Sequence, residues 1–188
     1  MATELILVRH GNAVRVNGDY FYAPLTQLGR EQAAETGEYF ASQQNHLDGF
    51  YASPIRRAQE TASIIGAKIK SIRWPIEGRV SAVLLEIVGR HPDQRVGVIS
   101  HAGAISAALA WYLPENRWHW WRATPGNCSI TRIRVEGSRA VILAENDTRH
   151  LSPVVITTQP PTKTVEIAKA AVTEKKALDT GATTDKKE

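Results

Sequence analysis

The sequence contains a single cysteine, Cys128, among 188 residues. One cysteine excludes an internal disulfide and is typical of proteins from a reducing compartment. The sequence also has no run of about 18 apolar residues, which a membrane-spanning helix needs. Its first residues, MATEL, lack the basic and long apolar regions of a secretory signal. We therefore expect a cytoplasmic protein with no membrane partner.

A strong excess of charge is also missing. The formal net charge is only +4, from 23 Lys and Arg against 19 Asp and Glu. Nucleic-acid binding needs clustered basic residues, and here they are scattered. The tryptophan-rich segment RWHWWRA, residues 117–123, is more typical of packing on a sheet edge or of a substrate mouth than of base stacking. We expect no nucleic-acid partner.

The length of the chain suits one domain with a well-buried core, because two ordinary domains need more residues. From residue 157 the sequence is rich in Thr, Lys, Ala and Glu and has almost no large apolar residues. Such a segment buries too little surface to offset the entropy lost on ordering. We predict a domain over residues 1–156 and a flexible tail over residues 157–188.

Short apolar runs alternate with helical patterns along the predicted domain. The runs at 5–8, 48–53 and 96–100 are typical of buried parallel strands. Helical spacing predicts helices over 27–42, from Pro54 onward, over 79–90 and over 102–113. Two later strands, at 129–135 and 139–144, form a predicted hairpin. This alternation predicts a doubly wound α/β fold, a three-layer sandwich with a mostly parallel central sheet.

Polar residues follow three of these strands directly. Arg9 and His10 end the first strand, residues 53–57 follow the second, and His101 follows VGVIS. Ligands of doubly wound folds bind beyond the carboxyl ends of the strands, so two histidines and two arginines are expected to meet there. A phosphoryl group, with its negative charge and three acceptor oxygens, is the natural counterpart of such a cluster. A neutral imidazole can also attack phosphorus and carry the group covalently.

A metal site is the alternative for a cluster with two histidines. Zinc needs three or four converging His, Cys, Asp or Glu ligands, and two neighbouring arginines would repel the cation. We therefore expect neither a metal nor another cofactor.

Five segments, LVRHGNA, PLTQLGREQA, YASPIRRAQETA, VGVISHAGAI and NDTRHL, occur in this order between residues 4 and 151. Together they resemble the histidine phosphatase superfamily, the phosphoglycerate mutase-like enzymes. The resemblance implies that His10 is the phosphorylated nucleophile, that Arg9 and Arg57 clamp the phosphate, and that His101 is the second histidine of the pocket. We place Gly11, Asn12 and Ala102 beside them as phosphate-binding residues, and expect Arg56 to face solvent.

The chain departs from the family pattern at the leaving-group acid. Thr61 and Ser100 are only 39 positions apart, which leaves little room for the long insertion whose Glu protonates the leaving oxygen in many members. The acidic residue that follows RHG in the family is replaced by Asn12. Glu77, in the connection RWPIEGR, is the candidate acid. Glu86 belongs to the outer side of the predicted helix 79–90, where we expect a surface role.

A short insertion favours good leaving groups or a bulky substrate that covers the site itself. We predict a phosphatase that hydrolyses a phosphate monoester or a phosphoprotein through a phosphohistidine on His10. The alternatives are a short phosphohistidine protein phosphatase, a phosphoglycerate mutase, or a catalytically idle phosphate-binding module. A mutase must exclude water from its phosphoenzyme, which a short insertion makes difficult. His91 and His150 lack partners of this kind, and we expect structural roles for them.

Overall fold

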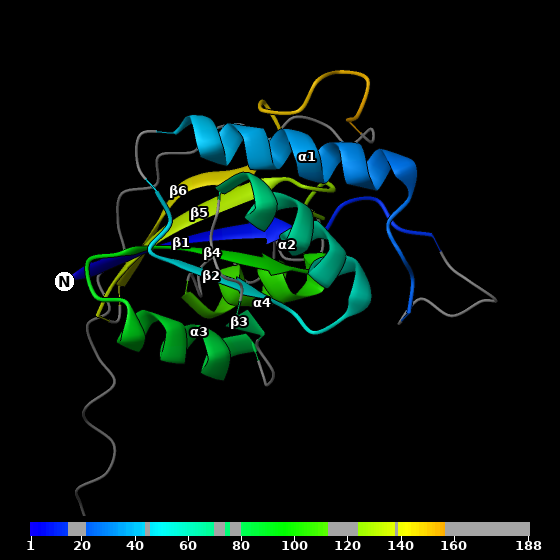
Figure 1. The fold of residues 1–188 in the computed structure, drawn as a ribbon. Helices are drawn as coiled ribbons and strands as arrows, with labels where there is room; N and C mark the ends of the chain where they lie inside the picture. The colour runs from blue at the N-terminus through cyan, green and yellow to red at the C-terminus, as the bar shows by residue number, and fades with distance from the viewer. Residues whose placement is uncertain are drawn as a thin grey trace, which may run out of the picture.

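The computed structural model describes residues 1–14, 22–43, 46–69, 74–75, 80–112, 124–137 and 139–156. In this part of the chain one six-stranded sheet has the order β3-β2-β4-β1-β5-β6 (Figure 1). The elements are β1 (Ala2–Arg9), α1 (Gln27–Ser42), β2 (Gly49–Ala52), α2 (Arg56–Ile69), β3 (Trp74–Pro75), α3 (Val80–Arg90), β4 (Arg95–Ser100), α4 (Ala102–Tyr112), β5 (Ile130–Glu136) and β6 (Arg139–Asp147).

The sheet is mostly parallel, as predicted. Strands β1, β2, β3 and β4 run parallel to one another, and the hairpin of β5 and β6 adds an antiparallel edge beside β1. The short strand β3 was not predicted, because a pair of residues shows no periodicity. The predicted tail, the tryptophan-rich segment and Glu77 lie outside the described residues.

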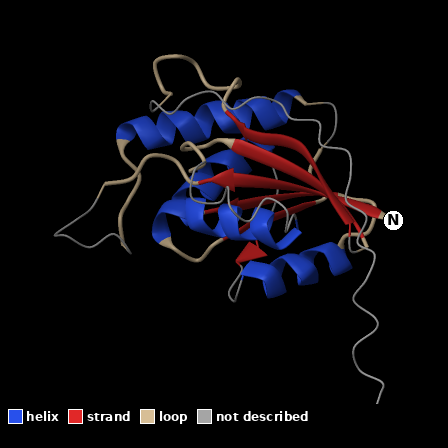
Figure 2. Cartoon of the chain, turned by 180° about the vertical axis from the view of Figure 1, so that it is seen from behind, coloured by secondary structure: helices blue, strands red, loops and turns tan. Residues whose placement is uncertain are grey.

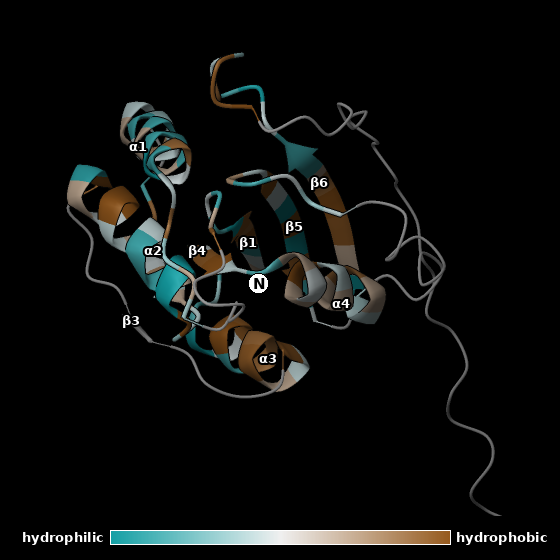
Figure 3. Cartoon of the chain, turned by 90° about the vertical axis from the view of Figure 1, so that its right-hand side faces the viewer, coloured by the Kyte–Doolittle hydropathy of each residue, from teal (hydrophilic) through white to brown (hydrophobic). Residues whose placement is uncertain are grey.

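Helices cover both faces of the sheet and form the outer layers of the predicted sandwich. Figure 3 shows α1 and α2 on one side of the strands and α3 and α4 on the other, and Figure 2 shows the sheet between them from behind. Successive side chains of β1 alternate between the layers: Leu5 and Leu7 pack with residues of α3 and α4, and Ile6 and Val8 with residues of α1 and α2. Both faces of β1 are therefore buried, which explains its continuous apolar run.

Helix α1 begins after Thr26, whose hydroxyl accepts a hydrogen bond from the Gly29 amide at 3.0 Å and so caps the helix. Its buried face contains two polar residues, Gln32 and Thr36, beside Gly29, Ala33, Gly37 and Phe40. Buried polar side chains need hydrogen-bond partners, so these two residues indicate contacts with specific backbone groups.

The chain after β6 returns along α1. Its Leu151 and Val155 are buried in a small apolar cluster with Ala33. The amide and the hydroxyl of Ser152 both donate to the carboxylate of Glu35, at 2.7 and 2.8 Å. Residues 148–156 thus pack against α1 through apolar and polar contacts. We call these residues the C-terminal segment.

Candidate active site

The two histidines of the site come from adjacent parallel strands. In the register of β1 and β4, Arg9 is paired with Ser100, so His10 and His101 leave the sheet side by side. Their ring centroids are 5.2 Å apart, with the ring planes tilted by 59°. The pairing of two strands far apart in the sequence therefore brings together the two imidazoles that the sequence predicts at this edge.

His101 is held from the next strand. The hydroxyl of Ser53, which follows β2, lies 2.8 Å from Nε2 of His101. The other ring nitrogen, Nδ1, is buried and has no hydrogen-bond partner among the described residues. A buried polar atom without a partner is unusual in a native structure.

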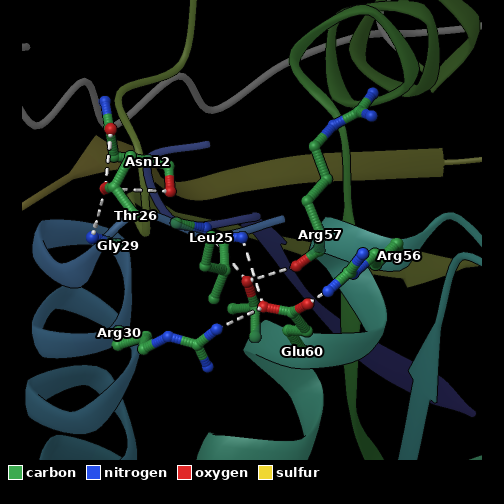
Figure 4. A network of polar contacts seen from close by, with 10 residues as sticks. Asn12, Leu25, Thr26, Gly29, Arg30, Arg56, Arg57 and Glu60 are labelled. Carbon is green, nitrogen blue, oxygen red and sulfur yellow. Dashed lines mark hydrogen bonds and ion pairs between the residues drawn. The ribbon is translucent and has the colours of Figure 1, made fainter. Parts of the chain in front are cut away.

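Arg57 lies in the first turn of α2 and contacts His10 directly. Its Nε donates a hydrogen bond to Nε2 of His10 at 3.0 Å, and the residue is only 7% exposed. Arg56 points the other way, as Figure 4 shows, and its Nε lies 2.7 Å from a carboxylate oxygen of Glu60. The side chain of Arg56 is 56% exposed, which agrees with the expected surface role.

Arg9 is oriented by the chain that precedes β5. Its guanidinium donates to the carbonyl of Pro125, and its own carbonyl accepts from the amide of Cys128. The positive charge of Arg9 also lowers the pKa of both His10 and His101. Two guanidinium groups, from Arg9 and Arg57, therefore act on the same pair of imidazoles.

His10 is neutral at physiological pH. Burial, together with the positive charges around it, lowers its pKa to about 3, although the hydrogen bond to the Gly11 carbonyl acts in the opposite direction. Burial and the same two arginines lower the pKa of His101 to about 4. The hydrogen bonds determine the tautomer of His10: Nδ1 lies 2.7 Å from the carbonyl of Gly11, and Nε2 faces Arg57, which can only donate. The proton is therefore on Nδ1, and Nε2 carries the lone pair.

The backbone after His10 is fully engaged within the protein. The Gly11 amide donates to the hydroxyl of Thr61 at 3.0 Å, and the Asn12 amide donates to the side chain of Gln32 at 2.8 Å. Neither of these amides is directed at a ligand, so the prediction that Gly11 and Asn12 bind phosphate receives no support from their backbone donors. Ala102 is the first residue of α4, where helix amides can face an anion.

Several supporting residues were missed by sequence reasoning. Gln32 and Thr61 occur inside the quoted motifs, but nothing in a residue type shows that its side chain holds a backbone amide. Asn127 donates from Nδ2 to the carbonyl of His10 at 3.0 Å. It belongs to none of the five segments, so the sequence carried no signal for it.

Three other residues named in the sequence analysis have partners outside this cluster. Glu86 is exposed and forms an ion pair with Arg90 one turn along α3. His91 follows α3, and its ring lies 2.8 Å from the hydroxyl of Tyr51. The ring of His150, in the C-terminal segment, lies 3.1 Å from the hydroxyl of Thr36. The candidate acid Glu77 is not among the described residues.

The described part of the chain contains neither a candidate metal site nor a candidate membrane span. No group of three or more His, Cys, Asp or Glu residues is placed there so that it could hold a metal ion. No helix of this part is both long and apolar enough to cross a membrane.

Comparisons with known proteins agree with the geometry. Residues 5–77 and 75–148 match the family model of the histidine phosphatase superfamily, branch 1. The serine/threonine-protein phosphatase Pgam5 of Drosophila ananassae is 39% identical over 93 residues, which cover 50% of this chain and 31% of that protein. Pgam5 of Caenorhabditis briggsae is 27% identical over 186 residues, 80% of this chain and 65% of the relative. The chain thus spans less than two thirds of the length of these relatives.

Solved structures show the same fold. A histidine-to-alanine variant of phosphoserine phosphatase from Entamoeba histolytica, in complex with phosphoserine, aligns with a TM-score of 0.68 and 21% identity, over 80% of this chain and 100% of that chain. The protein histidine phosphatase SixA, complexed with tungstate, aligns with a TM-score of 0.63 and 19% identity, over 74% of this chain and 93% of that chain. With the family model matching most of its length, the chain belongs to the histidine phosphatase superfamily.

Proposed function

We propose that this protein is a phosphatase that hydrolyses a phosphate monoester or a phosphoprotein through a phosphohistidine on His10. One observation carries the proposal: Nε2 of His10 holds a lone pair, because Nδ1 is protonated toward Gly11, and it lies 3.0 Å from the guanidinium of Arg57. A neutral nucleophile beside a fixed cation is the arrangement that phosphoryl transfer needs.

In the first step the phosphoryl oxygens replace Nε2 of His10 as the acceptor for Arg57. Arg9 and Nδ1 of His101 supply the other contacts with these oxygens. The lone pair of Nε2 then attacks phosphorus, a P–N bond forms, and the P–O bond to the leaving group breaks. The two arginines stabilise the charge on the equatorial oxygens in the transition state.

In the second step water attacks the phosphohistidine. The P–N bond breaks, its electron pair returns to Nε2, and inorganic phosphate leaves. In both steps Gly11 holds the proton on Nδ1, so the same tautomer of His10 is restored at the end of the cycle.

The leaving oxygen needs a proton in the first step when the leaving group is an alkoxide. Glu60 is engaged with Arg30, Arg56 and the amide of Leu25, so it is not a suitable donor. We propose Glu77 as the acid, because it belongs to the sequence that connects to α3.

We propose a phosphorylated protein as the substrate class favoured by the short span between Thr61 and Ser100. The similar proteins include a serine/threonine-protein phosphatase, a phosphoserine phosphatase and a protein histidine phosphatase, which supports a phosphorylated amino acid as the substrate. We propose a cytoplasmic location from the single cysteine, whereas the Pgam5 relatives are described as mitochondrial.

A substrate panel tests the proposal. The full chain is incubated with an aryl phosphate, a phosphoserine peptide, a phosphohistidine protein and 3-phosphoglycerate. Turnover of the aryl phosphate and of a phosphoprotein is the expected result. Interconversion of phosphoglycerates would indicate a mutase, and vanadate binding without any turnover would indicate an idle phosphate-binding module; either result overturns the proposal.

The nucleophile is tested by trapping the intermediate. A rapid alkaline quench with a labelled aryl phosphate retains a phosphohistidine, because this linkage is stable in base and labile in acid. We expect label on the unmodified chain and none on His10→Ala. The matched control is His46→Ala, since the side chain of His46 is 85% exposed. Full activity of His10→Ala would refute the mechanism.

A further inference from the structure

One peptide unit links the nucleophile to helix α1. The carbonyl of Gly11 and the amide N–H of Asn12 belong to the same planar peptide group. The carbonyl accepts from Nδ1 of His10 at 2.7 Å, and the N–H donates to Oε1 of Gln32 at 2.8 Å. In a trans peptide these two groups point in opposite directions, so whatever holds the N–H also directs the carbonyl.

Gln32 is held on its other side by the C-terminal segment. Its Nε2 donates to the carbonyl of Val155 at 2.6 Å, and the residue is 0% exposed. The orientation of the side-chain amide is unambiguous, because the Asn12 N–H requires an acceptor and the Val155 carbonyl requires a donor. A carboxamide supplies both from one neutral group, whereas an ionised carboxylate cannot donate.

The peptide unit lies close to the backbone of α1. A Cβ built on Gly29 would lie 2.8 Å from the amide nitrogen of Asn12, so the backbone of α1 packs directly against this unit. If the unit between Gly11 and Asn12 reversed, an N–H would replace the carbonyl beside Nδ1 of His10. The imidazole would then protonate on Nε2, and the nucleophilic lone pair would be lost.

We propose that Gln32 is a positioning residue for the nucleophile: it holds the peptide between Gly11 and Asn12 so that the Gly11 carbonyl keeps the proton of His10 on Nδ1. The hydrogen bond to the N–H also polarises the carbonyl, which strengthens its bond to Nδ1. Through the Val155 carbonyl, the C-terminal segment takes part in this arrangement. The inference rests on the proposed function, because the tautomer matters only if Nε2 of His10 attacks phosphorus.

The test compares Gln32→Met, which keeps the volume and removes both hydrogen bonds, with Glu35→Gln. The control loosens the contact with Ser152 in the same C-terminal segment and leaves the peptide unit untouched. The tautomer of His10 is read from the ¹⁵N chemical shifts of its imidazole in the ligand-free protein. We expect only the Nδ1–H form in the unmodified chain and in the control, and a substantial Nε2–H population in Gln32→Met.

Kinetics with an aryl phosphate provide the second measurement. Loss of an orienting partner typically costs about 10-fold to 100-fold in activity, so we expect kcat of Gln32→Met to fall by that factor. Its KM should stay close to that of the unmodified chain, because the arginine contacts to phosphate remain. A folded Gln32→Met with the Nδ1–H tautomer and unchanged kcat would overturn the proposal.

If Gln32→Met does not fold, Gln32→Glu takes its place. A protonated carboxyl restores both hydrogen bonds, and the ionised form loses the donor to Val155. The activity of Gln32→Glu should therefore fall as the pH rises, through an additional ionisation that the unmodified chain lacks. Identical pH profiles would refute the role of Gln32. The tautomer is measured without turnover, so it remains informative even if the substrate panel shows no phosphatase activity.

Discussion

Gly11 and Gly29 lie in direct backbone contact at the base of the site. A Cβ built on Gly11 would stand 2.4 Å from the carbonyl oxygen of Gly29, and a Cβ built on Gly29 would stand 2.0 Å from the carbonyl oxygen of Asn12. No side chain fits between the two segments, so both glycines are required for the approach of the loop after β1 to α1.

Substitution of Gly11 by alanine therefore forces the loop away from α1. We expect Gly11→Ala to lower the free energy of unfolding by about 1–3 kcal/mol, the usual cost of overpacking, and to reduce activity with it. Urea unfolding measures the first effect. Gly89→Ala is the control: this glycine is exposed in α3 with no atom within 4 Å of its built Cβ, so alanine should stabilise the helix by about 0.5–1 kcal/mol. Equal effects of the two substitutions would contradict the packing argument.

Arg56 and Arg57 provide a matched pair of neighbouring arginines. Arg57→Gln removes a cation that contacts His10, and kcat/KM should fall by roughly 100-fold to 1000-fold. Arg56→Gln removes an exposed ion pair with Glu60, which is worth at most about 1 kcal/mol of stability, and should leave kcat/KM unchanged. Steady-state kinetics with an aryl phosphate distinguishes the two variants. A larger loss for Arg56→Gln would show that Arg56, and not Arg57, is the phosphate-binding arginine.

The ionisation of His10 can be measured directly. Burial and the nearby positive charges lower the pKa of His10 to about 3, so its ring should remain neutral in the ligand-free protein throughout the pH range from 7 to 5. ¹H NMR of the imidazole Cε1 proton follows this. A titration midpoint near the usual histidine pKa of about 6.5 would show that burial does not lower the pKa of His10.

The same burial makes stability depend on pH. The pKa values of His10, His101 and His150 are lowered to about 3, about 4 and about 4 in the folded chain. Below the usual histidine pKa of about 6.5 the unfolded state binds protons that the folded state does not, so stability is complete above that pH and is lost as the pH falls toward the folded values.

Each such histidine lowers the free energy of unfolding by up to about 1.4 kcal/mol per pH unit in this range. Urea unfolding between pH 6.5 and 5 should show the decrease, and His150→Gln should reduce its slope by about one proton. A flat stability profile over this range would disagree with three buried neutral histidines.

Glu77→Gln examines the proposed leaving-group acid. A general acid contributes roughly 100-fold or more when an alkoxide leaves, so the variant should lose that factor with an alkyl phosphate. An aryloxide leaves without help, and turnover of an aryl phosphate should change little. Equal losses of activity with both substrates would show that Glu77 does not act as the leaving-group acid.

The layered fold was predictable because its signals are local. The continuous apolar runs of β1 and β4 indicate strands buried on both faces, and the spacing in α3 indicates a helix with one apolar face. The predicted ends of the elements were less accurate. Strand β1 begins at Ala2, three residues before the predicted run, since strand pairing extends beyond the apolar core. Within α1, Ala41 is exposed, whereas the polar residues Gln32 and Thr36 lie on the buried face.

By itself, the sequence determined which residue types follow the strand ends, because short apolar runs and the segments around them are readable along the chain. Only the tertiary structure decided how they act on one another. The register of β1 with β4 brings the two imidazoles together, and contacts across long sequence separations give His10 its neutral state and its tautomer. Desolvation and hydrogen bonding depend on what surrounds a group in space, and those surroundings come from segments distant in the chain.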